Sequence, residues 1–187
     1  MASTYPTSLD SFTNPTSTDT LASPAHATQH ADINDAMEAV QTKLAIGNTV
    51  IGTYTSYTPS FAAGVTIGNG VGSGGYCRVN NFVHVHGTFT LGSTSSVTAI
   101  IQMNVPVNIN AAMLSSTAPY GFSAYYDTSA GATYSGGTMY NGNAGSVFMT
   151  VSVVNATYAS IAYPTATIPF TWAVGDIIQW NLYYRAA

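Results

Sequence analysis

The spacing of apolar and polar residues changes near residue 48 and divides the chain into a helical part and a β-rich part. Over residues 23–47 the apolar positions recur at alternating steps of four and three, which is typical of an α-helix with one apolar seam. From residue 48 onward the period becomes two, the spacing of a half-buried strand. The sequence therefore predicts one short helix at residues 23–47, followed by a β-sandwich domain at residues 48–187.

The predicted helix carries its own start and stop signals. Ser23 followed by Pro24 is typical of a helix N-terminus, and Gly47 ends the periodic stretch. The apolar seam consists of His26, His30, Ile33, Met37, Val40 and Leu44. Two arrangements fit it: a trimeric coiled coil, or a helix that packs on its own β-domain. A polar arm, a short seam and a β-domain are a common layout in fibrous trimers, so we expect the seam to be the trimer interface.

Alternating residues predict many short strands in the second part. The clearest is 82–91, where Val83, Val85, Phe89 and Leu91 share one face. Predicted strands cover residues 49–57, 76–80, 82–91, 97–105, 122–126, 133–140, 146–153, 158–161 and 176–184. Gly-rich turns separate them, and we interpret residues 68–75 as a flexible connection. No helices alternate with these strands, so the expected fold class is mainly β, an antiparallel β-sandwich of jelly-roll type.

The first 22 residues form a polar arm rich in Ser, Thr and Pro. Such a segment cannot bury enough apolar surface to fold alone. It nevertheless holds four large apolar side chains, at Tyr5, Leu9, Phe12 and Leu21. We expect an extended attachment arm at residues 1–22 that docks on another protein; a disordered tail is the alternative.

Charged residues make up only 5% of the chain, against roughly 25% in an ordinary globular domain. After residue 48 they are limited to Arg78, Asp127, Asp176 and Arg185. Ser, Thr, Asn, Gly and Tyr must therefore solvate the surface, which suits close packing against copies of the chain or another assembly. The net charge of −4 argues against a nucleic-acid partner. No segment has the length or amphipathic pattern of a membrane element, so we expect no membrane partner.

Few side chains could carry chemistry, and we expect neither enzymatic activity nor a cofactor. A glycosidase needs two carboxyls flanking a bond, and the β-rich part has only Asp127 and Asp176. Asp176 lies in a turn before the last strand, where a carboxylate bonds local backbone amides. His84 and His86 share one face of a strand and could hold an ion on a three-fold axis. We favour the plainer interpretation of a polar or interface face.

Tyrosine is unusually frequent, with 13 residues in the chain. A tyrosine offers apolar area together with a hydroxyl, which suits protein interfaces and sugar stacking. We expect a recognition surface, with simple loop packing as the alternative, from a cluster in the Gly-rich middle of the chain: Tyr120, Tyr125, Tyr126, Tyr134 and Tyr140.

Two stretches of the chain resemble bacteriophage virion proteins. The first is similar to the N-terminal segment of phage tail-fibre and minor structural proteins, through Tyr5-Pro6, Asp10-Ser11-Phe12, Asn14-Pro15, Pro24-Ala25-His26 and Asn34-Asp35-Ala36-Met37-Glu38-Ala39. The second resembles a β-module of phage tail and fibre proteins, through residues 54–59, Gly68-Asn69-Gly70, Gly75-Tyr76-Cys77-Arg78-Val79, residues 83–87, Leu91-Gly92-Ser93-Thr94, and Trp172 with Gly175-Asp176.

The resemblance implies a structural protein of the virion surface, usually a homotrimer, made in the host cytoplasm. It does not separate a tail-fibre or minor tail protein from a capsid-decoration protein. We therefore expect a non-enzymatic virion component that binds copies of itself and, through its arm, another virion protein. Host-surface carbohydrate is a further candidate partner. The alternative function is a polysaccharide-binding or depolymerising protein that acts on the host surface.

Overall fold

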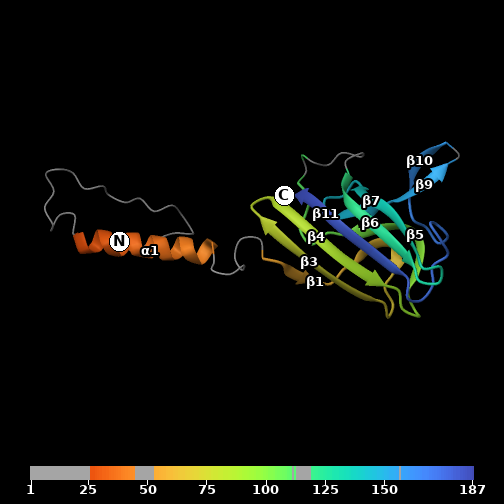
Figure 1. Cartoon of the computed structure of the whole chain (residues 1–187), viewed down its shortest axis with the longest axis horizontal. Helices are drawn as coiled ribbons and strands as arrows, with labels where there is room; N and C mark the ends of the chain where they lie inside the picture. Colours follow the sequence, from red (N-terminus) through yellow and green to blue (C-terminus); the bar gives the residue numbers. More distant parts are fainter. Residues whose placement is uncertain (1–25, 45–52, 111, 113–118, 156) are drawn as a thin grey trace. The chain divides into compact units, whose positions relative to one another are not determined.

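The computed structural model describes residues 26–44, 53–110, 112, 119–155 and 157–187. Two units, residues 1–53 and residues 54–187, are described separately, and we call the second the β-domain (Figure 1). The predicted attachment arm with Tyr5, Leu9, Phe12 and Leu21 lies outside the described residues. So do the predicted helix start at Ser23 and Pro24 and its stop at Gly47.

The described part of the first unit is one helix, α1 (His26–Leu44), which confirms that the 3.5-residue spacing marks a helix. Two residues of the predicted seam, Ile33 and Met37, are each 54% exposed, and Val40 is half-buried. The rings of His26 and His30 lie one turn apart and their Nε2 atoms are 2.7 Å from each other. Two apolar residues of the predicted seam, Ile33 and Met37, are therefore exposed on α1.

The β-domain is mainly one antiparallel sheet. The strands are β1 (Thr55–Tyr57), β2 (Phe61–Thr66), β3 (Val71–Val79), β4 (Phe82–Thr90), β5 (Ser96–Asn104), β6 (Pro119–Asp127), β7 (Ala132–Tyr140), β8 (Ser146–Met149), β9 (Val151–Asn155), β10 (Tyr158–Ala162) and β11 (Ile177–Arg185). In the described residues they form a nine-stranded sheet, in the order β1-β3-β4-β11-β6-β7-β8-β5-β2, and a two-stranded ribbon of β9 and β10.

The sheet curls until its two edge strands approach each other. The edges are β1 and β2, which follow each other in the chain with only residues 58–60 between them. A connection of that length spans at most about 14 Å, so a flat sheet of nine strands cannot form. Phe61 on β2 packs edge-to-face against Phe89 on β4, with ring centroids 5.2 Å apart, and lies 6.5 Å from Trp180 on β11. The concave side of the curl thus encloses the core.

Strict alternation on β4 and β11 supplies the centre of that core. β11 buries every second residue and exposes or half-buries the others, and β4 does the same except at the half-buried Gly87, as the period of two predicts. The largest fully buried side chains are Tyr125, Tyr184, Phe89, Ile101, Met103, Ile109, Met149, Ile178, Leu182, Val83, Val85 and Val147. The prediction of a mainly β domain with one helix is confirmed.

Three details differ from the expectation. Residues 71–75 belong to β3 and are not a flexible connection, because glycine leaves room on the inner face for aromatic rings. A Cβ at Gly74 would lie 2.5 Å from the Tyr57 ring. The predicted strand 146–153 is two strands, β8 and β9, since Thr150 leaves the ladder and its N–H donates to the Gly137 carbonyl at 2.8 Å. Strand β2 was not predicted, because Gly64 with φ +83° interrupts its alternation.

Candidate binding surface on the β-domain

The convex side of the sheet carries a cluster of aromatic and imidazole rings. It is built from outward positions of neighbouring strands, where His84 pairs with Tyr183, and Asn181 pairs with both His86 and Phe122. We define the aromatic face as Tyr54, Phe82, His84, His86, Phe122 and Tyr183. The four larger rings, Tyr54, Phe82, Phe122 and Tyr183, are between 49% and 53% exposed. Half-exposed large rings grouped on one face are typical of an interaction surface.

His84 is held by a hydrogen bond on each ring nitrogen. Its Nε2 lies 2.8 Å from Oδ1 of Asn181, and its Nδ1 contacts the hydroxyl of Tyr54. An amide oxygen only accepts, so Nε2 carries the hydrogen and donates it to Asn181. The two contacts hold the His84 ring in place between Asn181 and Tyr54.

Several rings of the aromatic face pack against one another. Tyr183 stacks on His84, with centroids 4.5 Å apart and planes at 9°, and lies 6.1 Å from Phe82 at 26°. Tyr54 meets His86 edge-on at 5.1 Å. The aromatic face is therefore held together by contacts between its own rings.

The aromatic face is almost free of charge. Among the outward positions of β3, β4, β6 and β11 the only charged side chain is Arg185, at the end of its strand. Cys77 is half-buried on the same face, at the β3 position that pairs with His84. Burial, followed by the neighbouring Cys77, raises the pKa of Tyr54 above its usual 10.0, so the phenol stays protonated at neutral pH.

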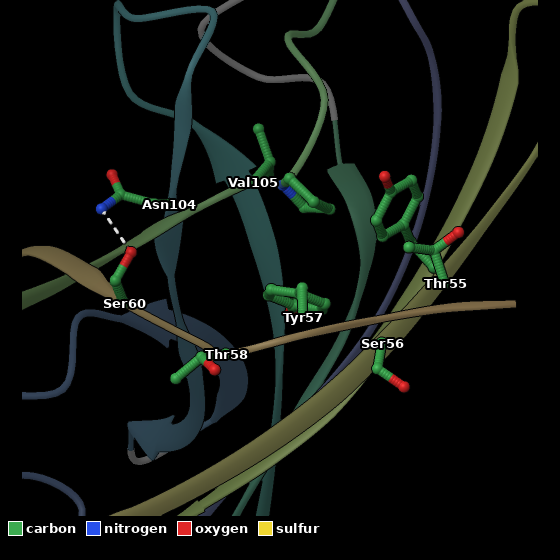
Figure 2. Close-up of a pocket in the computed structure, with 9 residues that line it drawn as sticks. Thr55, Ser56, Tyr57, Thr58, Ser60, Asn104 and Val105 are labelled. Carbon is green, nitrogen blue, oxygen red and sulfur yellow. Dashed lines mark hydrogen bonds between the residues drawn. The ribbon is translucent and has the colours of Figure 1, made fainter.

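A shallow pocket lies where the chain crosses from β1 to β2 (Figure 2). Its volume is about 340 Å³, and it is lined by Thr55, Ser56, Tyr57, Thr58, Ser60, Tyr76, Asn104, Val105 and Pro106. The side-chain amide of Asn104 donates to the Ser60 hydroxyl at 2.9 Å and closes one wall. The Tyr57 hydroxyl accepts from the Trp180 indole N–H at 2.8 Å. No lining side chain is a carboxylate or an imidazole, so the pocket offers binding groups rather than acid–base groups.

The predicted tyrosine surface is wrong for two of its five members. Tyr120 is 2% exposed and Tyr125 is fully buried, because both point to the inner side of β6. The Tyr125 hydroxyl donates to the Thr150 carbonyl at 2.9 Å. Tyr126, Tyr134 and Tyr140 are half-buried. Tyr134 is paired with Tyr125 in the ladder and packs on Phe170, so the five residues do not share one face.

Both carboxylates of the β-domain accept hydrogen bonds from turn residues. Asp176 is 1% exposed and accepts from the backbone N–H of Ala173 at 2.6 Å and of Thr128 at 2.9 Å, as the sequence predicted for a turn residue. Asp127 accepts from the hydroxyl of Ser129 at 2.7 Å and from the N–H of Ala130 at 3.0 Å. These bonds, the Ser129 hydroxyl first, lower the pKa of Asp127. Neither carboxylate is placed as a free acid or base.

The histidine pair lies on one face of β4, as the sequence predicted, with ring centroids 6.0 Å apart. In the described part of the chain, no group of three His, Cys, Asp or Glu side chains could hold a metal ion. Among the described residues, no helix combines the length and the apolar composition needed to cross a membrane. Periodicity placed His84 and His86 on one face of their strand, but Tyr54, Phe122 and Tyr183 were not expected as site residues. Tyr183 alternates with the inward residues of β11, and the same alternation on β6 could have put Phe122 on an outward position.

Comparison with protein-family models, with curated proteins and with solved structures gives no match for this chain.

Proposed function

We propose that this chain is a non-enzymatic structural protein of a bacteriophage particle, a homotrimer joined by helix α1. Its arm, residues 1–22, attaches it to another virion protein, and its β-domain faces outward. Either a tail-fibre or minor tail role or a capsid-decoration role fits this description, and both place the protein on the virion surface.

The observation that carries the proposal is the exposed apolar seam of α1. Ile33 and Met37 are each more than half exposed, at positions four residues apart on one face. An isolated helix of 19 residues is only marginally stable in water. Exposed apolar residues at coiled-coil spacing gain free energy when three helices bury them together. A trimeric coiled coil therefore explains both why the seam exists and how a short helix is stabilised.

Two further features support a structural role. The antiparallel sheet curls so that side chains on its inner face pack against one another. The two sheets of a jelly-roll sandwich also pack through their inner faces, so the curled sheet is compatible with that fold. The carboxylates Asp127 and Asp176 are committed to turn hydrogen bonds, which leaves no free carboxyl pair in the β-domain for cleaving a glycosidic bond. The uncharged aromatic face favours a binding role, so among the alternatives a polysaccharide-binding protein stands above a depolymerase.

Light scattering on the purified full-length chain tests the trimer. We expect a mass three times the 19.5 kDa of one chain. Val40→Asp should reduce the mass to that of one chain, because three carboxylates would be buried on one axis at several kcal/mol each. Gln41→Asp, the neighbouring exposed position off the seam, is the matched control and should stay trimeric. A wild-type mass of one chain would contradict the proposal.

Immunogold labelling of phage particles tests the location. Label on the tail would assign the protein to a fibre or minor tail protein, and label over the head to capsid decoration. Particles that carry no label at all would contradict the virion assignment.

A further inference from the structure

We propose that the pocket at the crossing from β1 to β2 is a binding site for one unit of a neutral sugar. The pocket lies wholly within the β-domain, and its lining includes no residue of helix α1 or of the arm. The site therefore adds a ligand to the proposed structural role and does not depend on the trimer. The chemistry that it recognises is an uncharged pyranose ring, either free or within a glycan.

The pocket exists because the curl of the sheet brings its two edges together without pairing them. The lining comes from β1 and Tyr76 of β3 on one side, and from Asn104 at the end of β5 with Val105 and Pro106 on the other. In the described sheet, β1 and β2 stand at opposite ends of the strand order, so no ladder joins the two edges. The hollow of about 340 Å³ that remains is at the lower end of the roughly 300–1,000 Å³ typical of small-ligand sites.

Hydrogen bonds and packing within the β-domain hold the walls in place. Asn104 bonds Ser60 twice, from its backbone N–H to the carbonyl at 3.0 Å and from its side-chain amide to the hydroxyl at 2.9 Å (Figure 2). The Tyr57 hydroxyl is fixed by the Trp180 indole N–H, and its ring lies against Gly74, where a Cβ would come within 2.5 Å. Side chains that are already ordered lose little conformational entropy when a ligand binds.

Several polar groups of the lining remain available to a ligand. Ser60 accepts from Asn104 and keeps its own hydroxyl hydrogen to donate. Thr55 and Thr58 are exposed and present further hydroxyls. Tyr76 is half-buried, and its hydroxyl has no hydrogen-bond partner among the described residues. Because each hydroxyl can both donate and accept, the lining matches a ligand whose own groups do the same.

This combination fits a sugar better than other small ligands. A pyranose has an apolar C–H face and a rim of hydroxyls. The pocket offers partners for both: the half-buried rings of Tyr57 and Tyr76, packed at 69° with centroids 6.3 Å apart, and the hydroxyl and amide groups beside them. A charged ligand would find no opposite charge in the lining, and burying it unpaired is costly. A purely apolar ligand would leave the hydroxyls without partners.

Saturation-transfer NMR on the full-length protein tests the site. The probes are the methyl glycosides of glucose, galactose, mannose and N-acetylglucosamine. We expect at least one of them to bind with a dissociation constant in the millimolar range, as for a small ligand in a shallow pocket. Methyl glucuronide, in which a carboxylate replaces the hydroxymethyl group of the glucoside, is the charged comparison. It should bind about threefold or more weakly than the best neutral probe, because no cation of the lining pairs with it.

Two variants assign the binding to the pocket. Tyr76→Phe removes the hydroxyl that has no partner in the protein and should weaken binding by about 2–10-fold, the loss expected for one hydrogen bond. Tyr158→Phe, at a tyrosine that is 77% exposed on the β9–β10 ribbon, is the matched control and should bind like the wild type. Thr55→Trp places a large side chain at an exposed lining position and should abolish the signal. If thermal unfolding shows that Thr55→Trp does not fold, Tyr76→Phe against Tyr158→Phe decides alone.

Three results would overturn the sugar site. They are the absence of a signal from every neutral glycoside, binding that Tyr76→Phe and Thr55→Trp leave unchanged, and tighter binding of the glucuronide. A wild-type mass of one chain, with these binding results as expected, would instead overturn the trimer alone.

Neutral oligosaccharides of increasing length separate the two sources of the sugar. Affinity that grows with length would support the site and assign it to a polysaccharide chain. Affinity that stays constant would support the site and assign it to a free or terminal sugar.

Discussion

Met37 on helix α1 and Met103 on strand β5 are the same residue type in opposite surroundings. Met37 is 54% exposed, whereas Met103 is fully buried among the inner side chains of the sheet. The β-domain encloses a core of inner apolar side chains with its own strands, whereas α1 exposes Ile33 and Met37. Under the proposed trimer, α1 would bury these two side chains against other copies.

Burial distinguishes the two regions. A buried large side chain contributes about 1.5–3 kcal/mol relative to an exposed one. The inner side chains of the β-domain gain that contribution within one chain. Under the proposed trimer, Ile33 and Met37 of α1 would gain it only on association, so the stability of α1 should depend on protein concentration while that of the β-domain should not.

The largest expected effect comes from shortening the two methionines. Met103→Ala leaves a cavity in the core and should lower the free energy of unfolding of the β-domain by about 2–5 kcal/mol. Met37→Ala should leave that free energy unchanged within about 0.5 kcal/mol and instead raise the concentration needed for trimers. Urea unfolding followed by tryptophan fluorescence, together with light scattering on dilution, measures both. If Met37→Ala lowered the free energy of unfolding of the β-domain as much as Met103→Ala does, the contrast between the two regions would be contradicted.

A somewhat smaller effect is expected from adjacent glycines on β7. A Cβ at Gly136 would overlap the backbone carbonyl of Thr150, which cannot move without breaking the turn between β8 and β9. Gly136→Ala should therefore cost about 1–3 kcal/mol. Gly137→Ala is the matched control, because its Cβ would lie 3.3 Å from the nearest atom, the Gly121 carbonyl oxygen. Thermal unfolding of both variants should separate them, and equal melting temperatures would show that the sheet relaxes freely there.

A third effect is the loss of β-domain stability at high pH. Burial raises the pKa of Tyr57 from 10.0 to about 12, against a weaker opposing effect of the Trp180 hydrogen bond. The folded phenol thus holds its proton more tightly than the unfolded one. Its contribution is complete below pH 10.0 and is lost as the pH rises through about 12. Urea unfolding at increasing pH should show stability falling across this window.

Tyr57→Phe removes this titration and should make the decline shallower. The variant should also be less stable at neutral pH by about 1 kcal/mol, because the Trp180 indole N–H loses its acceptor. Tyr125 and Tyr184 also have raised pKa values, so a residual decline is expected. A decline as steep as that of the wild type would show that Tyr57 is not one of the groups responsible.

Periodicity made much of the β-domain predictable. Residues 82–91 and 176–184 were expected as strands with alternating faces; β11 buries every second residue, and β4 does so except at Gly87. The signal is strong there because both strands are central and one side of each faces the core. It fails where a local exception interrupts the period of two. Gly64 bends β2, and Thr150 separates β8 from β9.

The candidate site was harder to predict than the fold. Tyr120 and Tyr125 were expected on a surface, yet β6 directs both inward. Composition counts tyrosines but does not say which side of a strand they occupy. The aromatic face combines residues from strands far apart in the chain, such as Tyr54 and Tyr183, which meet only because β3, β4 and β11 pair in that order. The spacing of residues within one segment does not predict which distant strands pair with each other.

The smallest expected change in β-domain stability follows from deleting residues 1–22. The buried apolar side chains of the β-domain lie between Val83 and Ala186, so its free energy of unfolding should change by less than about 0.5 kcal/mol. Attachment to particles should nevertheless be lost. Tyr5, Leu9, Phe12 and Leu21 gain free energy only when another protein buries them, at about 1.5–3 kcal/mol each. Melting of the truncated chain and immunogold occupancy on particles measure the two outcomes. Wild-type occupancy without the arm would move attachment to the β-domain and reverse the proposed orientation, with the aromatic face then the first surface to test.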